Sequence, residues 1–287
     1  MNREGATMGE STNTVSTSIY NEKYFEKYGH NRKHYCENVA VHLTLKGLSA
    51  FLIKSFPNLR GQKHLDVGCA FGFLVQYMRE KGVHSYGLDV SEYAIRNAVP
   101  EARRYVWVQD ITQKPIDDKY DLITCVEVIE HIPRQNELMV LTELVRKSKY
   151  FYLSSGYDLD DPTHVNCKPL SYWISVIWKL GYVPKAEVYA GIPWGRIYYK
   201  PTVMKSLEEY LKLHTQEEIW RRDRGNCVMC GRKAHEIRFL VSREEFNEEN
   251  LWEAYAHWNR ALLCNSCFVR LENPLFLEAA SYKLKSS

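Results

Sequence analysis

The chain has 287 residues, enough for one large domain or two smaller ones. With 45% hydrophobic and 25% charged residues it has the composition of an ordinary globular protein. Its formal net charge of +3 is too small for charge alone to indicate a nucleic-acid or membrane partner. No apolar run approaches the roughly 20 residues that span a bilayer, so we expect a cytoplasmic protein with no membrane partner.

The N-terminal region divides into two parts. Residues 1–18 are polar and rich in Ser and Thr, and we expect a disordered tail there. Residues 20–56 favour one or two helices that pack across the mouth of the domain that follows. Tyr20, Tyr24 and Tyr28 recur every fourth residue on one helical face, which is typical either of core packing or of a lid over a site.

Strand and helix patterns alternate from about residue 60 to residue 200. Strands are expected at 63–68, 85–90, 104–110, 120–129, 150–156, 184–190 and 195–201, and helices at 73–82, 91–98, 134–147 and 169–181. Crossover helices imply parallel strands, and nearly continuous apolar runs imply a sheet covered on both faces. The last two strands are joined by a short turn, so one of them should be antiparallel. The fold class is therefore α/β, with a doubly wound, mostly parallel seven-stranded sheet.

The character of the chain changes after Pro201. Residues 206–223 form a charged amphipathic pattern, followed by a segment with two pairs of cysteines. We place a boundary near residue 204, which gives a domain over 19–204 with an N-terminal helical cap. Residues 205–287 are expected to form a helical linker and a small α+β module.

A glycine-rich turn follows the first strand, in the stretch "LDVGCAFG" that ends at Gly72. In doubly wound sheets, ligands bind at the carboxyl ends of the strands, and small residues let a ligand approach the backbone closely. The spacing is not the G-x-G-x-x-G of nicotinamide enzymes. Asp66, Asp89 and Asp110 stand at or just after the ends of three successive strands, which indicates a nucleoside-like ligand at this edge.

These motifs resemble those of the class I, Rossmann-like S-adenosylmethionine-dependent methyltransferases. "LDVGCAFG" is similar to the first motif of that family, with Ala70 in place of the middle glycine, and "YGLDVS", "VWVQDI" and "YDLITCVEVIEHI" follow in the family's order. The resemblance covers about residues 20–200 and implies S-adenosylmethionine as the cofactor. The residues it implies for cofactor binding are Asp66, Gly68, Cys69, Ala70, Gly72, Asp89, Val90, Asp110, Ile111, Val126 and Glu127.

The resemblance also assigns roles to the acids. Asp66 would hold the amino group of the methionine moiety, Asp89 would accept the two ribose hydroxyls, and Asp110 would accept the adenine amine while Ile111 packs on the ring. A carboxylate with two oxygens suits a pair of hydroxyls. Val126 and Glu127 would lie near the methionine end.

Two histidines are candidates for the methyl-acceptor side. His131 follows the fourth strand and is either a structural residue of its loop or a group that faces the cofactor. His164 lies in "DPTHVN", which resembles a loop of methyltransferases that act on sugars and other small molecules. It is a candidate catalytic base or acceptor-binding group, or else it orders the loop, and Asp161 is a possible orienting partner.

Two C-x2-C pairs, Cys227 with Cys230 and Cys264 with Cys267, predict a structural zinc ion. Four thiolates fill a tetrahedral site and leave no open position. The framework resembles that of HNH nucleases, but the expected catalytic histidine pair is absent, so we interpret the module as a degenerate form. It either stabilises an accessory domain or binds nucleic acid.

Together these patterns predict an enzyme that transfers a methyl group from S-adenosylmethionine to an O or N atom of a small molecule or sugar. Two alternatives remain open. One is a nucleic-acid methyltransferase whose zinc module binds RNA or DNA. The other is a non-catalytic, zinc-dependent adaptor with a vestigial cofactor fold. The oligomeric state is not predicted.

Overall fold

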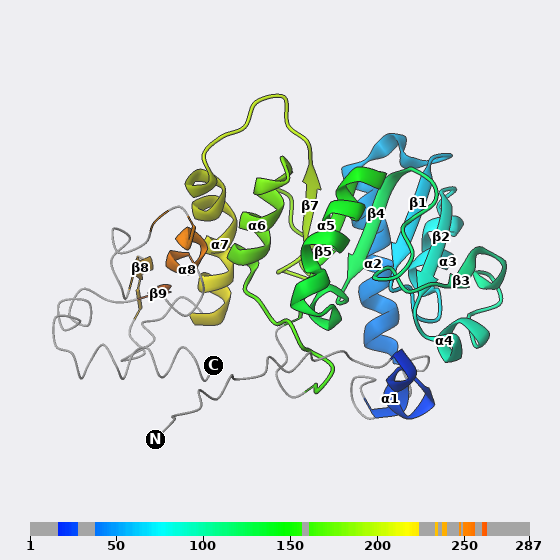
Figure 1. Ribbon diagram of the computed structural model, residues 1–287. Helices are drawn as coiled ribbons and strands as arrows, with labels where there is room; N and C mark the ends of the chain where they lie inside the picture. The colour runs from blue at the N-terminus through cyan, green and yellow to red at the C-terminus, as the bar shows by residue number, and fades with distance from the viewer. Residues whose placement is uncertain are drawn as a thin grey trace, which may run out of the picture.

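The computed structural model describes residues 17–27, 38–156, 161–223, 233–234, 237–239, 247, 249–255 and 260–262. The predicted tail up to residue 16, Tyr28 and the four paired cysteines lie outside these residues. The described chain forms a seven-stranded sheet of order β3-β2-β1-β4-β5-β7-β6 (Figure 1). Its strands are β1 (Lys63–Val67), β2 (His84–Asp89), β3 (Val106–Val108), β4 (Tyr120–Val126), β5 (Ser148–Ser154), β6 (Val183–Pro184) and β7 (Arg196–Tyr199).

Helices cover both faces of this sheet. They are α1 (Glu22–Lys27), α2 (Val39–Ser55), α3 (Phe73–Glu80), α4 (Glu92–Arg96), α5 (Arg134–Lys147), α6 (Leu170–Lys179), α7 (Leu207–Asp223) and α8 (Leu251–Ala254). One apolar core joins α2 and α3 to the sheet through Leu52, Met78 and Leu122. A larger core lies on the other face, where Leu144 of α5 and Ile174 of α6 pack with buried side chains of β1, β4 and β5. Burial on both faces explains why these strands are apolar almost throughout.

The strand directions agree with the predicted doubly wound sheet. β1 pairs in parallel with β2 and with β4, β2 with β3, and β4 with β5. β7 pairs antiparallel with β5, and β6 antiparallel with β7, so the prediction that one late strand runs against the others is confirmed. The carboxyl ends of β1 to β5 therefore lie at one edge of the sheet.

The strand predicted at 184–190 is wrong for most of its length. Only Val183 and Pro184 pair with β7. The Lys185 amide still donates to the Ile197 carbonyl oxygen at 2.7 Å, and further along a side chain holds the segment, since the Tyr189 hydroxyl donates to the Thr44 carbonyl oxygen of α2 at 3.0 Å. The sequence of a segment that is anchored by one side chain can look like that of a strand, so the pattern alone could not separate the two.

Local signals place several helix ends where the sequence predicted them. The Ser91 hydroxyl caps α4 by accepting from the Ala94 amide at 3.0 Å. α5 spans the predicted residues 134–147. α6 ends just before Gly181, whose φ of 83° is a conformation that glycine adopts without strain.

The described C-terminal elements pack onto the sheet domain. Leu207 and Leu211 of α7 and Tyr255 after α8 belong to the same core as α5 and α6. β8 (Ile237–Phe239) and β9 (Arg260–Leu262) form a separate antiparallel pair. Among the described residues, no helix combines the length and the apolar character needed to cross a membrane.

Candidate functional site

The turn between β1 and α3 has an unusual backbone. Gly68, Ala70 and Gly72 have φ values of 75°, 45° and 81°. Ala70 is one of two non-glycine residues with positive φ in the described chain. This conformation lies at the carboxyl end of β1, where doubly wound sheets bind their ligands.

Protein side chains account for the small size of two turn residues. A Cβ atom on Gly68 would lie 2.2 Å from Cγ2 of Val128, and one on Gly72 would lie 2.7 Å from the Ala102 Cβ. Cys69 is buried and its side chain lies against Gly87 of β2, so only its backbone can serve a ligand. The glycines are therefore required by packing as well as by backbone conformation.

Asp89 fastens the turn to the end of β2. Its Oδ2 accepts from the Ala70 amide and its Oδ1 from the Ser91 amide, both at 2.8 Å. Burial raises the pKa of Asp89, and these amide donors oppose that shift. Val90 follows and is half-buried. The predicted ribose-binding acid is thus positioned beside the first-motif turn.

Asp66 lies inside a chain of buried polar side chains. The Thr124 hydroxyl donates to Asp66 Oδ1 at 2.6 Å, and the His64 ring contacts Thr124 Oγ1 at 2.9 Å and Ser85 Oγ at 2.7 Å. Burial raises the pKa of Asp66 to about 7, and the nearby Asp89 adds to the shift. Among the described residues Asp66 makes no ion pair, so an ammonium group would offset the cost of its burial.

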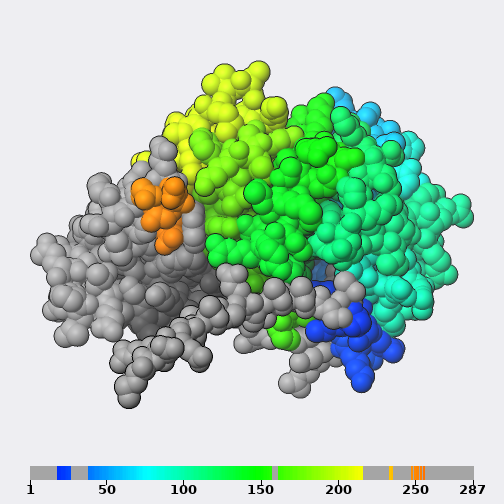
Figure 2. All heavy atoms as spheres, viewed as in Figure 1, coloured from blue at the N-terminus to red at the C-terminus, as the bar shows by residue number. Residues whose placement is uncertain are grey.

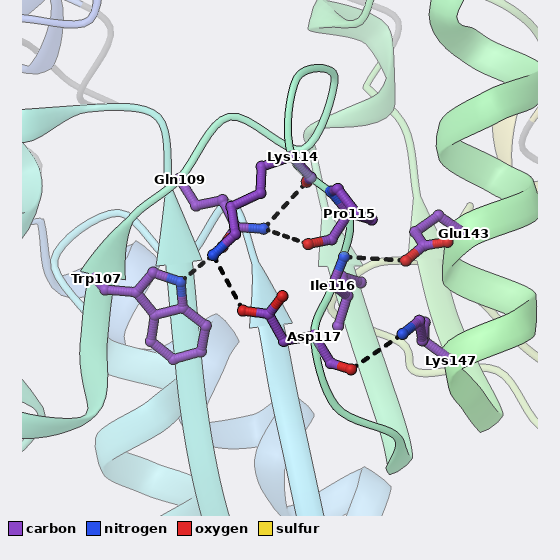
Figure 3. A network of polar contacts seen from close by, with 8 residues as sticks. All are labelled: Trp107, Gln109, Lys114, Pro115, Ile116, Asp117, Glu143 and Lys147. Carbon is purple, nitrogen blue, oxygen red and sulfur yellow. Dashed lines mark hydrogen bonds and ion pairs between the residues drawn. The ribbon is translucent and has the colours of Figure 1, made fainter.

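The third acid lies in a hydrogen-bonded loop after β3. Asp110 Oδ1 accepts from the amide and the hydroxyl of Thr112 at 2.8 and 2.7 Å, and Ile111 beside it is buried. Gln109 anchors this loop, because its amide donates to the Lys114 and Pro115 carbonyl oxygens while its Oε1 accepts from the Trp107 indole (Figure 3). Asp66 near the end of β1, Asp89 at the end of β2 and Asp110 just after β3 therefore lie at the carboxyl ends of three neighbouring strands.

A second polar cluster lies after β4 and β5, on the side predicted for the methyl acceptor. His131 Nδ1 lies 3.2 Å from the Thr163 carbonyl oxygen and 2.9 Å from the Thr163 hydroxyl. A carbonyl oxygen only accepts, so Nδ1 carries the proton. Burial and the neighbouring His164 lower the pKa of His131 to about 4. At neutral pH its Nε2 therefore carries a free lone pair, the form that binds metals.

Glu130 is fully buried beside this histidine. Its Oε1 accepts from the Gly156 amide at 2.7 Å, whereas Oε2 has no hydrogen-bond partner among the described residues. Burial, and then the charge of Glu127, raise the pKa of Glu130 well above its usual range. A Cβ on Gly156 would lie 2.6 Å from Glu127 Oε2 and 3.0 Å from Glu130 Oε1, so both carboxylates converge over this glycine.

These side chains could hold a divalent cation. Glu130, His131 and His164 each bring one ligand atom within 4.8 Å of the others. Asp161 is buried nearby, with Oδ2 3.9 Å from His164 Nε2, and its Oδ1 accepts from the Thr163 hydroxyl. A ligand histidine that donates its other N–H to an acceptor is the usual arrangement in metal sites.

Sequence reasoning identified His131, His164 and Asp161 but missed Glu130 as a functional residue. The spacing E-x-x-E-H, from Glu127 to His131, was a signal that could have revealed it. Such a pattern is ambiguous, because the same spacing is common on solvated helices. Here a φ of 54° at Glu127 and a short 3-10 helix over Ile129–His131 turn the acids inward.

The N-terminal segment bridges the two polar groups. The Ser91 hydroxyl donates to the Tyr20 carbonyl oxygen at 2.6 Å, and the Tyr20 ring makes an edge contact with His131. Phe25 of α1 packs on Phe71 of the glycine turn. Figure 1 shows α1, in dark blue, at the edge of the sheet where the parallel strands end, and Figure 2 shows its atoms at the surface of the molecule.

Residues 28–160 match the family model described as "Methyltransferase domain". The sheet order, the glycine turn after β1 and this match together give the chain the class I, Rossmann-like fold of S-adenosylmethionine-dependent methyltransferases, as the motifs predicted.

The relatives are named as methyltransferases. The chain is 24% identical over 178 residues to a ubiquinone biosynthesis O-methyltransferase of Leptothrix cholodnii, covering 58% of this chain and 65% of that one. It is 33% identical over 90 residues to the protein of the same name from Idiomarina loihiensis, covering 29% and 37%. The match thus spans less than two thirds of each relative.

Among solved structures, the chain is similar to magnesium protoporphyrin IX methyltransferase from Synechocystis PCC 6803 with bound SAH. The two share 19% sequence identity with a TM-score of 0.48, over 64% of this chain and 98% of the other.

Proposed function

We propose that the chain is an S-adenosylmethionine-dependent methyltransferase that methylates an oxygen atom of a small molecule with the help of a divalent cation. The observation that carries the proposal is the placement of two polar groups at one sheet edge. Three acids lie at the carboxyl ends of β1, β2 and β3, and a Glu–His–His cluster with a buried glutamate lies after β4 and β5. The relatives named O-methyltransferases support an oxygen acceptor.

The chain's own residues would perform the binding steps. Asp66 holds the cofactor's amino group, Asp89 accepts the ribose hydroxyls and Asp110 the adenine amine, with Ile111 against the ring. The cofactor supplies an activated methyl group. Val126 and the N-terminal segment would align the acceptor and exclude water, and Glu127 would add a second carboxylate beside Glu130.

In this proposal His131 and His164 bind the cation rather than act as bases. Glu130 supplies a buried carboxylate, and Asp161 positions His131 through Thr163. A divalent cation would polarise an acceptor hydroxyl and make its proton easier to lose. Mixed carboxylate and imidazole ligands suit Mn²⁺, Fe²⁺ or Zn²⁺ better than they suit Ca²⁺.

Transfer of a labelled methyl group tests the proposal. The full chain would be incubated with labelled S-adenosylmethionine and Mn²⁺ against fractionated metabolites and RNA. We expect label in a small-molecule fraction, and its loss in His164→Ala. Label in polynucleotide only would contradict the small-molecule acceptor, and full activity of His164→Ala without added cation would contradict the role of the cluster.

A further inference from the structure

Trp194 lies beside the proposed cation site although 40% of its surface is exposed. It belongs to the segment between β6 and β7, in the part that was predicted as a turn between the last two strands. Its indole Nε1 donates to Glu127 Oε1 at 2.8 Å. An exposed tryptophan whose indole donates to a half-buried carboxylate, beside the buried Glu130, is a specific arrangement.

The protein holds this tryptophan in place from both sides. Tyr189 is anchored to the Thr44 carbonyl oxygen of α2, and Ile192 is buried in the core beneath α2. After the tryptophan, the guanidinium of buried Arg196 donates to the Pro193 carbonyl oxygen at 2.6 Å. With the flanking backbone fixed, the indole N–H is directed at Glu127 at little further cost in conformational entropy.

The hydrogen bond fixes which oxygen of Glu127 enters the cluster. Oε1 is engaged by Trp194, while Oε2 lies near Gly156, beside Glu130 Oε1. The strained backbone at Glu127 sets the direction of the side chain, and the indole sets the rotation of its carboxylate. The indole donor therefore restrains the rotation of the carboxylate that keeps Oε2 beside Glu130.

We infer that Trp194 is a positioning residue that orients Glu127 for cation binding and couples the segment between β6 and β7 to the site. The inference rests on the proposed function, since it presupposes the cation. Hydrogen bonds from outer residues orient ligating carboxylates, and losing one typically costs about 10- to 100-fold in metal affinity.

Binding of Mn²⁺, followed by electron paramagnetic resonance on the full chain, tests this role. Trp194→Phe keeps an aromatic ring but removes the donor, and we expect Mn²⁺ to bind roughly 10-fold more weakly. Trp178→Phe is the matched control, because its Nε1 donates to the Lys205 carbonyl oxygen and does not contact the cluster. That variant should bind Mn²⁺ like the wild type.

A double-mutant cycle separates positioning from a general structural effect. In a Glu127→Ala background, Trp194→Phe should produce little further loss of Mn²⁺ affinity. Full additivity of the two changes, or unchanged affinity in Trp194→Phe alone, would overturn the inference while leaving the cation site intact. Absence of Mn²⁺ binding in the wild type would overturn the cation site and this inference with it.

Discussion

The acids at the strand ends differ in their electrostatic environment, although the sequence presents them alike. Asp89 accepts two backbone amides. Asp66 is buried with a threonine and a histidine, and its pKa is raised to about 7. Asp110 accepts from its own loop. The burial that separates these roles depends on strands distant in sequence, so the motif could predict the positions but not the charge states.

Asp66 gives a prediction about pH. Below pH 7 its carboxyl is largely protonated in the free protein, whereas a cationic amino group favours the ionised form. The affinity for S-adenosylmethionine should therefore rise roughly tenfold from pH 5.5 to pH 7, with release of a proton on binding.

Calorimetry in buffers of different ionisation enthalpy measures both the affinity and the proton release. Asp66→Asn should bind more weakly and show no such dependence. An affinity that falls over this range, or an equal slope in the variant, would contradict the assigned role of Asp66.

The cluster of Glu130, His131 and His164 shows what single residues in a sequence cannot reveal. Glu130 and His131 are adjacent, but His164 lies 33 positions further along the chain. Their convergence depends on parallel pairing of β4 with β5 and on the positive φ of Glu127. The sequence could therefore suggest these side chains one by one, but not that they converge on one point.

At the scale of elements, α5 and α6 were predictable because each has a clear apolar face and end signals. The segment after β6 was not predictable, since the side chains of Tyr189 and Ile192 anchor most of it and no ladder of backbone hydrogen bonds does. The tyrosine stripe was ambiguous. Tyr20 contacts both Ser91 and His131, which supports a lid as well as packing.

The N-terminal segment over residues 17–27 should respond to the cofactor. We expect S-adenosylmethionine to slow hydrogen exchange there. The reason is that the segment contacts Phe71 of the glycine turn and Ser91, which lies two residues after Asp89. Ser91→Ala removes the hydroxyl that holds the Tyr20 carbonyl oxygen and should reduce that protection. Loss of the helix cap should cost about 1 kcal/mol of stability.

Exchange measured by mass spectrometry, with and without the cofactor, distinguishes the possibilities. The backbone amide of residue 91 remains in Ser91→Ala, so Asp89 keeps that donor. If exchange over residues 17–27 is equal in the free and bound protein, the segment is a packing element and not a lid.

At the scale of the whole molecule, we predict cofactor binding for the sheet domain and zinc binding for the C-terminal region. The core of α5 and α6 extends to α7 and α8, so the two regions share apolar contacts. The cysteine pairs lie outside the described residues, and zinc binding stays a prediction from their spacing. The fold class was predictable from the alternating pattern, because that pattern extends over the whole domain.

Two metal sites of different chemistry should be separable by mutation. We expect elemental analysis of the wild type to find about one zinc ion per chain. The double variant with Cys227→Ser and Cys264→Ser should lose this zinc and still bind Mn²⁺. His164→Ala should retain zinc and lose Mn²⁺ binding. Zinc retained in full by the cysteine variant would contradict the four-thiolate site.

The central claim is that the carboxyl edge of the sheet binds S-adenosylmethionine, and titration calorimetry of the full chain tests it most directly. Asp89→Ala should weaken binding roughly 100-fold, or about 2.7 kcal/mol, through the loss of charge-assisted hydrogen bonds. Asp118→Ala is the control, since that exposed acid pairs with Lys63 at the opposite end of β1. Undetectable binding by the wild type, or equal affinity in Asp89→Ala, would contradict the account.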